Sequence, residues 1–154
     1  MLHHAGVLGP PHNPMLARIK SQDWPSLPAD LAHDLDVALL TPGFTTAWWA
    51  RALGKSHPTV VRRLAGISEA LRPEAIENWN SITREDCIRL SQIDGHMPIP
   101  VLIQMAADKR DGMTKAEVMK LYGCSHHCVD QAVAKPLLSS PRLPDWFRSL
   151  IPGA

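Results

Sequence analysis

Polar and basic side chains recur along one side of a short segment near the middle of the chain. They are Lys55, His57, Thr59, Arg62 and Arg63, with Val61 among them. Arginine can donate hydrogen bonds to guanine edges or to phosphates, and hydroxyl and imidazole groups can bond to either. A helix that presents such groups outward fits the major groove of duplex DNA. The residue types therefore indicate recognition of nucleic acid.

The flanking residues predict a helix-turn-helix over about 46–65. Gly54 tolerates the positive φ of a tight turn, Ser56 is placed to cap the second helix, and Pro58 falls in its first turn. The small Ala50 allows the two helices to cross closely. Four apolar residues at helical spacing form the shared inner face, namely Trp49, Leu53, Val60 and Leu64. An ordinary helical hairpin with a solvated basic face is the alternative.

The remaining segments are mostly helical in period, and none alternates as a strand does. We expect further helices over roughly 30–41, 68–79, 81–93 and 98–107. The predicted fold class is therefore all-α, a multi-helix bundle that contains the helix-turn-helix. Residues 1–28 are rich in proline and predict a flexible arm outside the core. Residues 29–135 would form the helical domain, and residues 136–154 a proline-rich tail with a short amphipathic helix.

A second hairpin of helix-turn-helix type is predicted over about 114–133. Gly123 can form its turn, and Ser125 can cap its second helix. Its polar residues are secondary candidates for DNA binding, namely Lys115, His126, His127 and Gln131. Met119 stands where Ala50 stands in the first hairpin, so close crossing would be harder. The alternative is a hairpin that only completes the domain.

Composition argues against several other functions. The 154 residues carry a formal net charge of +1, so any DNA affinity must come from local clustering. Three cysteines without framework spacing fit a reducing cytoplasm, and we find no secretory signal and no apolar run long enough to cross a bilayer. We find no phosphate-binding glycine loop and no nucleophile elbow, so we expect no catalytic residues, no enzyme activity and no cofactor. The cluster at 124–128 is too crowded on one turn to surround a zinc ion, so no metal site is expected.

The sequence resembles the central DNA-binding region of ParB and KorB proteins in three runs. They are A-R-A-L-G-K-S-H-P-T-V-V-R-R-L, then I-S-E-A-L-R-P-E-A-I-E-N-W, then S-I-T-R-E-D-C-I-R-L-S-Q-I. The resemblance covers roughly residues 30–122. It implies sequence-specific binding to double-stranded DNA, as a transcriptional repressor or a partition-type factor of a plasmid, phage or other mobile element. Such a protein would act at the nucleoid in the bacterial cytoplasm.

The resemblance also implies roles for single residues. Four residues would approach the bases, namely Ser56, His57, Thr59 and Arg62. Three would fix the register on phosphates, namely Thr46, Lys55 and Arg63. Arg84 and Arg89 follow the helix-turn-helix and are secondary candidates. The family's N-terminal nucleotide-binding domain and C-terminal dimerisation domain have no recognisable counterpart, so nucleotide binding is not expected.

The tail has an apolar patch formed by Trp146, Phe147, Leu150 and Ile151. This patch could dock on the chain's own core, join two copies as a homodimer, or bind a protein partner. Docking on the core is the more frequent outcome. The alternative function is therefore a protein-interaction adaptor that keeps the helix-turn-helix shape and uses this tail.

Overall fold

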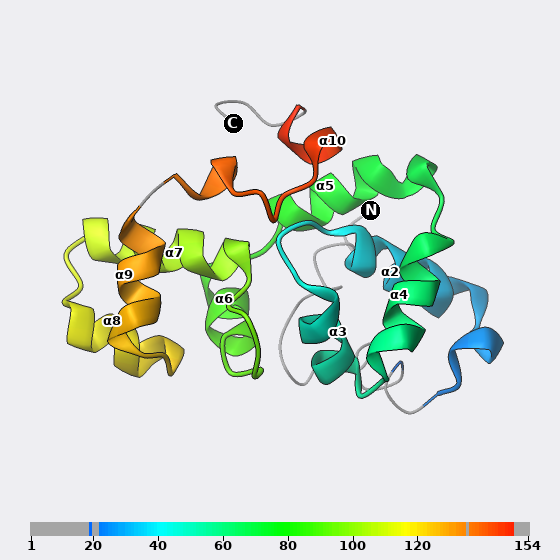
Figure 1. The fold of residues 1–154 in the computed structure, drawn as a ribbon, viewed down its shortest axis with the longest axis horizontal. Helices are drawn as coiled ribbons and strands as arrows, with labels where there is room; N and C mark the ends of the chain where they lie inside the picture. Colours follow the sequence, from blue (N-terminus) through cyan, green and yellow to red (C-terminus); the bar gives the residue numbers. More distant parts are fainter. Residues whose placement is uncertain (1–18, 20–21, 135, 150–154) are drawn as a thin grey trace.

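The computed structural model describes residue 19, residues 22–134 and residues 136–149. Within this part of the chain the elements are α-helices and short 3-10 helices, without a strand, which confirms the predicted all-α class. The helices form two groups that lie side by side, and the segment after α9 returns over the first group (Figure 1). No helix among the described residues is long and apolar enough to cross a membrane.

The first group, which we call the first unit, extends from α2 to α5. Its elements are η2 (Trp24–Ser26), α2 (Ala29–Leu40), α3 (Thr46–Leu53), α4 (His57–Ala65), η3 (Glu69–Leu71) and α5 (Arg72–Asn80). Pro28 precedes α2 with extended backbone, which starts the helix without a side-chain cap. The helix expected over 68–79 is divided, because Ser68 caps η3 before Pro73 enters the first turn of α5.

The second group, which we call the second unit, extends from α6 to α9. Its elements, and those of the returning segment, are α6 (Arg84–Leu90), α7 (Ile99–Arg110), α8 (Lys115–Tyr122), α9 (His126–Ala134), η4 (Leu137–Ser139) and α10 (Asp145–Arg148). A capping box starts α6, because Thr83 and Asp86 each accept a hydrogen bond from the other's backbone N–H.

The two units repeat one arrangement. In each, a 12-residue helix (α2 or α7) precedes an 8-residue helix (α3 or α8) and a 9-residue helix (α4 or α9). Pro28 and Pro98 stand immediately before the two long helices. The same faces are buried, since Leu31 and Leu35 of α2 correspond to Val101 and Met105 of α7. The fold therefore contains two related sets of three helices, α2–α4 in the first unit and α7–α9 in the second.

The core contains more aromatic residues than the sequence pattern predicts. Trp48 is as deeply buried as Trp49, and their rings meet edge to face with centroids 5.0 Å apart. The expectation that residues 1–28 stay outside the core is wrong for Ile19 and Trp24, which are both buried in it. Residues 1–18 and 20–21 of that arm lie outside the described residues. Apolar side chains in a proline-rich stretch can therefore still be recruited to a small helical core.

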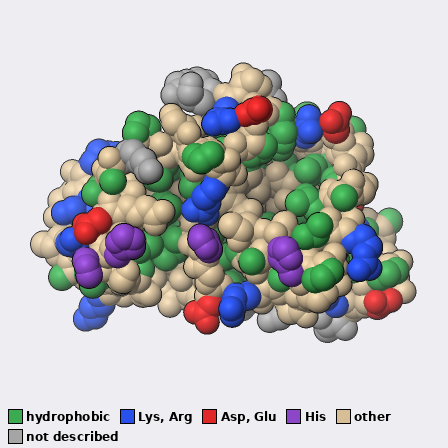
Figure 2. Space-filling model, in the orientation of Figure 1, with side chains coloured by type: hydrophobic (Ala, Val, Ile, Leu, Met, Phe, Trp, Pro, Cys, Tyr) green, Lys and Arg blue, Asp and Glu red, His purple; other side chains and the backbone are tan. Residues whose placement is uncertain are grey.

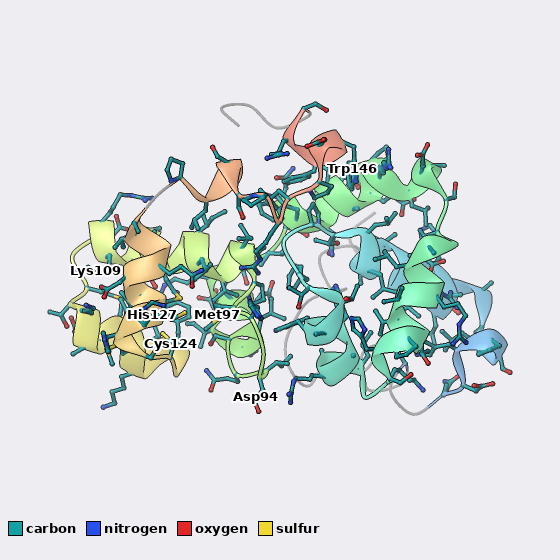
Figure 3. The ribbon with its side chains drawn as sticks, viewed as in Figure 1. Asp94, Met97, Lys109, Cys124, His127 and Trp146 are labelled. Carbon is teal, nitrogen blue, oxygen red and sulfur yellow. The ribbon has the colours of Figure 1, made fainter. Side chains whose placement is uncertain are left out.

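The tail docks on the protein's own core. Phe147 of α10 is buried, and its ring lies 4.7 Å from that of Trp79 on α5. Trp146, labelled beside α5 in Figure 3, stacks with the guanidinium of Arg72 at 4.9 Å. Self-docking is thus the outcome for the described part of the patch, whereas Leu150 and Ile151 lie outside the described residues.

The two units and the tail meet at Gly43. Its carbonyl oxygen accepts a hydrogen bond from the backbone N–H of Ile99 at 2.9 Å and one from Nη2 of Arg142 at 3.4 Å. The same Nη2 donates to the carbonyl oxygen of Met97 at 2.9 Å. A Cβ atom at position 43 would come within 3.0 Å of Ile99 Cβ and Pro100 Cδ. Only glycine therefore lets the α2–α3 loop approach the start of α7 so closely.

We predict that Gly43→Ala destabilises the protein more than Gly112→Ala does. Both glycines have positive φ, +90° and +110°, so both substitutions strain the backbone by about 1–3 kcal/mol. Gly43 adds crowding worth about 1–3 kcal/mol, whereas a Cβ at Gly112 meets nothing within 4 Å. Urea unfolding followed by circular dichroism measures the difference in the free energy of unfolding. Equal losses for the two variants would contradict the tight junction.

Candidate nucleic-acid interface

The first hairpin has the turn that the sequence predicts. Gly54 adopts left-handed φ and ψ of 64° and 34°, and the N–H of Lys55 donates to the carbonyl of Ala50 at 3.0 Å to close α3. Thr45 caps α3, and its Oγ1 accepts from the N–H of Trp48 at 3.0 Å. Ser56 caps α4 as predicted, with Oγ accepting from the N–H of Thr59 at 3.3 Å. These bonds fix α3 and α4 as a helix-turn-helix.

The inner face of this hairpin matches the prediction. Trp49, Leu53 and Val60 are at most 2 % exposed, and Leu64 is half-buried. Ala50 packs half-buried against this cluster, at the predicted crossing of the helices. Val60 and Leu64 face inward on α4, and the opposite side of that helix faces solvent. Val61 is 44 % exposed there, and Arg62 is exposed beside it.

Four predicted site residues are brought together at the N-terminus of α4. Oγ1 of Thr46 and Nε2 of His57 share a hydrogen bond of 2.6 Å. Oγ of Ser56 and Oγ1 of Thr59 share one of 2.7 Å. The first bond ties the start of α3 to the start of α4, so it orients the imidazole before any ligand arrives. With Arg62, one turn further on and without an ion pair in the described structure, these residues form what we call the α4 polar face.

Two predicted phosphate contacts are used inside the protein instead. Arg63 does not point outward as predicted, because Nε donates to Oδ1 of Asp36 at 2.8 Å and its side chain is only 21 % exposed. Its Nη atoms reach the carbonyls of Trp24 and Ala32 at 3.4 Å. Nζ of Lys55 donates to the carbonyl of Gln22 at 2.7 Å and lies 5.8 Å from the Trp24 ring centre. The ion pair and these bonds serve to hold α4 and its turn against α2 and η2.

Carboxylates are absent from this part of the sequence. No Asp or Glu occurs from Val37 to Ser68, while Arg51 and Arg62 are exposed on α3 and α4. Asp36, at the edge of this stretch, is paired with Arg63. The first hairpin therefore presents no carboxylate of its own that would repel phosphate groups.

The second hairpin repeats the same backbone. Gly123 has φ and ψ of 64° and 39°, and the N–H of Cys124 donates to the carbonyl of Met119 at 3.1 Å. Thr114 and Glu117 form a capping box at the start of α8. Ser125 caps α9, since its Oγ accepts from the N–H of Cys128 at 3.3 Å. Met119 stays half-buried and does not prevent the hairpin, contrary to the difficulty expected from its size.

The outward surface of α9 differs in charge from that of α4. His126, His127 and Gln131 are exposed, as predicted, and Figure 3 shows His127 near the start of α9. Lys115 is not free, because Nζ pairs with Oδ1 of Asp130 at 2.6 Å. Figure 2 shows histidine side chains over both halves of this face of the molecule. The second hairpin therefore offers hydrogen-bonding groups but little net positive charge.

The thiols of Cys124 and Cys128 lie against each other. Burial raises the pKa of Cys128 to about 11 and also raises the pKa of Cys124. Both groups therefore stay as neutral thiols near neutral pH, poor as nucleophiles. Among the described residues, no group of three or more His, Cys, Asp or Glu side chains is arranged to hold a metal ion.

Arg84, 40 % exposed, belongs to a network around the buried Asp108 that sequence reasoning missed. Nε of Arg84 donates to Oδ1 of Asp108 at 3.0 Å, and the Tyr122 hydroxyl donates to Oδ2 at 2.5 Å. Gln104 donates to the same carboxylate at 3.1 Å. Burial opposes ionisation of Asp108, but the bonds from Arg84, Tyr122 and Gln104 outweigh it and lower its pKa. The network joins α6, α7 and α8, so Arg84 positions the second hairpin and is not a free DNA contact.

The sequence did contain one signal for this network. Asp108 follows Val101 and Met105 on the buried side of α7, where an acid requires a partner. The partner helices could not be identified from spacing alone. Arg89, the other secondary candidate of this region, is half-buried on α6 and forms no salt bridge within the described residues.

The geometry therefore defines an all-helical protein with two helix-turn-helix hairpins, of which the first is basic and lacks acids. No known family model, curated protein or solved structure matches the chain. The resemblance to ParB and KorB proteins accordingly stays a prediction.

We predict that Asp108→Asn lowers the free energy of unfolding by about 1–3 kcal/mol at neutral pH, because Arg84 and Tyr122 lose their charged partner. In the unfolded chain the pKa of an aspartate is about 4, and in the folded protein the pKa of Asp108 is lower than that. Its stabilisation is therefore complete above that unfolded value and is lost as the pH falls through the folded pKa. Urea unfolding at several pH values should show that the free energies of unfolding of the variant and the unaltered protein differ at neutral pH and converge at low pH.

Asp111→Asn is the matched control for this experiment. Asp111 is exposed, just beyond the end of α7, and forms no salt bridge within the described residues. Its replacement should leave stability nearly unchanged at every pH. An Asp108→Asn protein as stable as this control at pH 7 would show that the network contributes nothing.

Proposed function

We propose that the protein binds double-stranded DNA in a sequence-specific manner, with α4 in the major groove. The observation that carries this proposal is the α4 polar face, on a helix held by a left-handed glycine turn and a buried inner face. Ser56, His57, Thr59 and Arg62 supply donors and acceptors over little more than one and a half turns. Recognition helices of this motif use side chains of these types to contact base edges.

Local hydrogen bonds strengthen this assignment. The bonds Thr46–His57 and Ser56–Thr59 restrict side-chain rotamers, so less conformational entropy is lost when the helix meets its target. The lack of carboxylates from Val37 to Ser68 removes repulsion by phosphates. Arg63 and Lys55 then act by holding the hairpin and are not assigned to phosphates. The exposed Arg51 of α3 takes the phosphate role in their place.

The second hairpin has a secondary part in this function. In Figure 1, α4 and α9 are drawn in front of the long helices α2 and α7, so both second helices lie on the same side of the molecule. His126, His127 and Gln131 are exposed there. A chain of this type would act as a transcriptional repressor or partition-type factor of a mobile element, in the bacterial cytoplasm.

We predict that Arg62→Ala weakens binding to a preferred duplex by about 5–150-fold, which corresponds to about 1–3 kcal/mol for a base contact. The preferred duplex is first selected from a random-sequence library with the unaltered protein. Fluorescence anisotropy at fixed salt then compares the two proteins, and circular dichroism checks that the fold is retained. A duplex of unrelated sequence shows whether the loss depends on sequence.

Arg110→Ala provides the control, because Arg110 is an exposed arginine on α7, outside both hairpins. It should retain most of the duplex affinity. If the library yields no enriched sequence, or if Arg62→Ala binds the selected duplex as tightly as the control does, the proposed function is wrong.

A further inference from the structure

An open apolar groove lies between α7, α9 and η4. It encloses about 730 Å³, and its lining is mainly aliphatic. Ile103 and Ala106 come from α7, Ala132 and Val133 from α9, and Leu137 from η4. Val133 is 50 % exposed, and among the large apolar side chains of the described residues only Val61, at 44 %, is similarly exposed. Concave, mostly apolar surfaces are the usual places where proteins bind other groups, so this groove is a candidate binding site.

The first unit shows why the groove is open. Residues 29–40 of α2 correspond to residues 99–110 of α7, and the α3–α4 hairpin corresponds to α8–α9. In the first unit, the ion pair of Asp36 with Arg63 bridges α2 and α4. The corresponding residues of the second unit are Ala106 and Ala132, and both line the groove. Two short side chains thus replace a long bridging pair.

The first unit also shows what kind of element covers this surface. There α5 packs along α2: Oε2 of Glu74 lies 2.6 Å from Nε2 of His33, and Asn78 donates to Oγ1 of Thr41 at 2.9 Å. The position of His33 corresponds to Ile103 in the groove. In the second unit the element that follows η4, α10, lies over α5 instead, where Phe147 packs on Trp79. The long helix α7 therefore has no equivalent of α5 among the described elements at this groove.

Charge at the groove favours an acidic occupant. Lys109 and Arg110 line its end, and Figure 3 shows Lys109 near the end of α7. Neither cation forms a salt bridge within the described part of the chain. An apolar floor with two cations at one end is complementary to an amphipathic helix that carries Glu or Asp beside its apolar stripe.

We propose that this groove binds an acidic amphipathic helix of a partner protein, in the place that α5 occupies in the first unit. The apolar stripe of that helix would cover Ile103, Val133 and Leu137, and its carboxylates would meet Lys109 and Arg110. The groove lies apart from the α4 polar face, so this proposal does not depend on DNA binding.

The test uses a fluorescent synthetic peptide of residues 70–82 of this chain as the probe, since it contains α5 with Glu74 and Glu77. Anisotropy measures its affinity for the full-length protein, and amide chemical shifts locate its site. We expect the shifts to cluster at the groove. The double variant Lys109→Glu with Arg110→Glu should weaken binding at least tenfold, whereas Lys120→Glu, an exposed lysine on α8, should not.

Charge reversal on the peptide makes the test specific. A peptide with Glu74→Lys and Glu77→Lys should bind the doubly reversed protein more tightly than the unaltered protein. Ala106→Asp with Ala132→Arg recreates the pair of the first unit and should abolish binding. If that variant does not fold, Val133→Glu, at a half-exposed position, should reduce binding at least tenfold.

Three results would overturn the proposal. The first is no binding of the peptide at millimolar concentration, or shifts confined to other surfaces. The second is a requirement to delete residues 150–154 before the peptide binds, which would make the chain's own end the occupant. The third is a dimer in sedimentation that Val133→Glu dissociates, which would make a second copy the occupant. Arg62→Ala should leave peptide affinity unchanged, so failure here is distinguishable from failure of DNA binding.

Discussion

The close approach at Gly43 is the constraint on which the arrangement of the two units depends. The α2–α3 loop touches the start of α7 there, with no space for a Cβ atom. One carbonyl oxygen at this point accepts from the backbone of Ile99 and from Arg142 of the returning tail. Each hairpin is fixed within its own unit by a left-handed glycine and a cap, but their relation to each other is set at this junction. A recognition surface that uses both hairpins would therefore rely on it.

The two units share one helical arrangement but use their charged side chains differently. In the first unit, Lys55 donates to the carbonyl of Gln22 and Arg63 pairs with Asp36 of α2, while the α3–α4 hairpin itself contains no acid. The second pairs Lys115 with Asp130 and secures its hairpin through the Asp108 network. The first unit is thus the better DNA-binding candidate, and the second has an open seam where a bridging pair is missing. The same helical arrangement thus carries a bridging ion pair in one unit and an open apolar groove in the other.

Local signals in the sequence predicted the elements well but not the partners of long side chains. Gly54, Ser56 and the inner-face residues act through neighbours within one or two turns, so spacing was enough to find both hairpins. Arg63 was wrongly placed on the outer surface, because its partner Asp36 is 27 residues away and no local rule connects them. The burial of Trp24 and the Asp108 network were missed for the same reason. Of the candidate site, the polar start of α4 was predictable, and the roles of its cations were not.

Arg142 ties the tail to both units, and it has no carboxylate partner among the residues that the structure describes. Its guanidinium donates to the carbonyls of Gly43 and Met97, and burial lowers its pKa. Hydrogen bonds to partly buried backbone carbonyls are screened far less by dissolved ions than a surface ion pair is. Raising the ionic strength should therefore leave this three-way junction intact, so the two hairpins keep the same placement relative to each other in dilute and in concentrated salt.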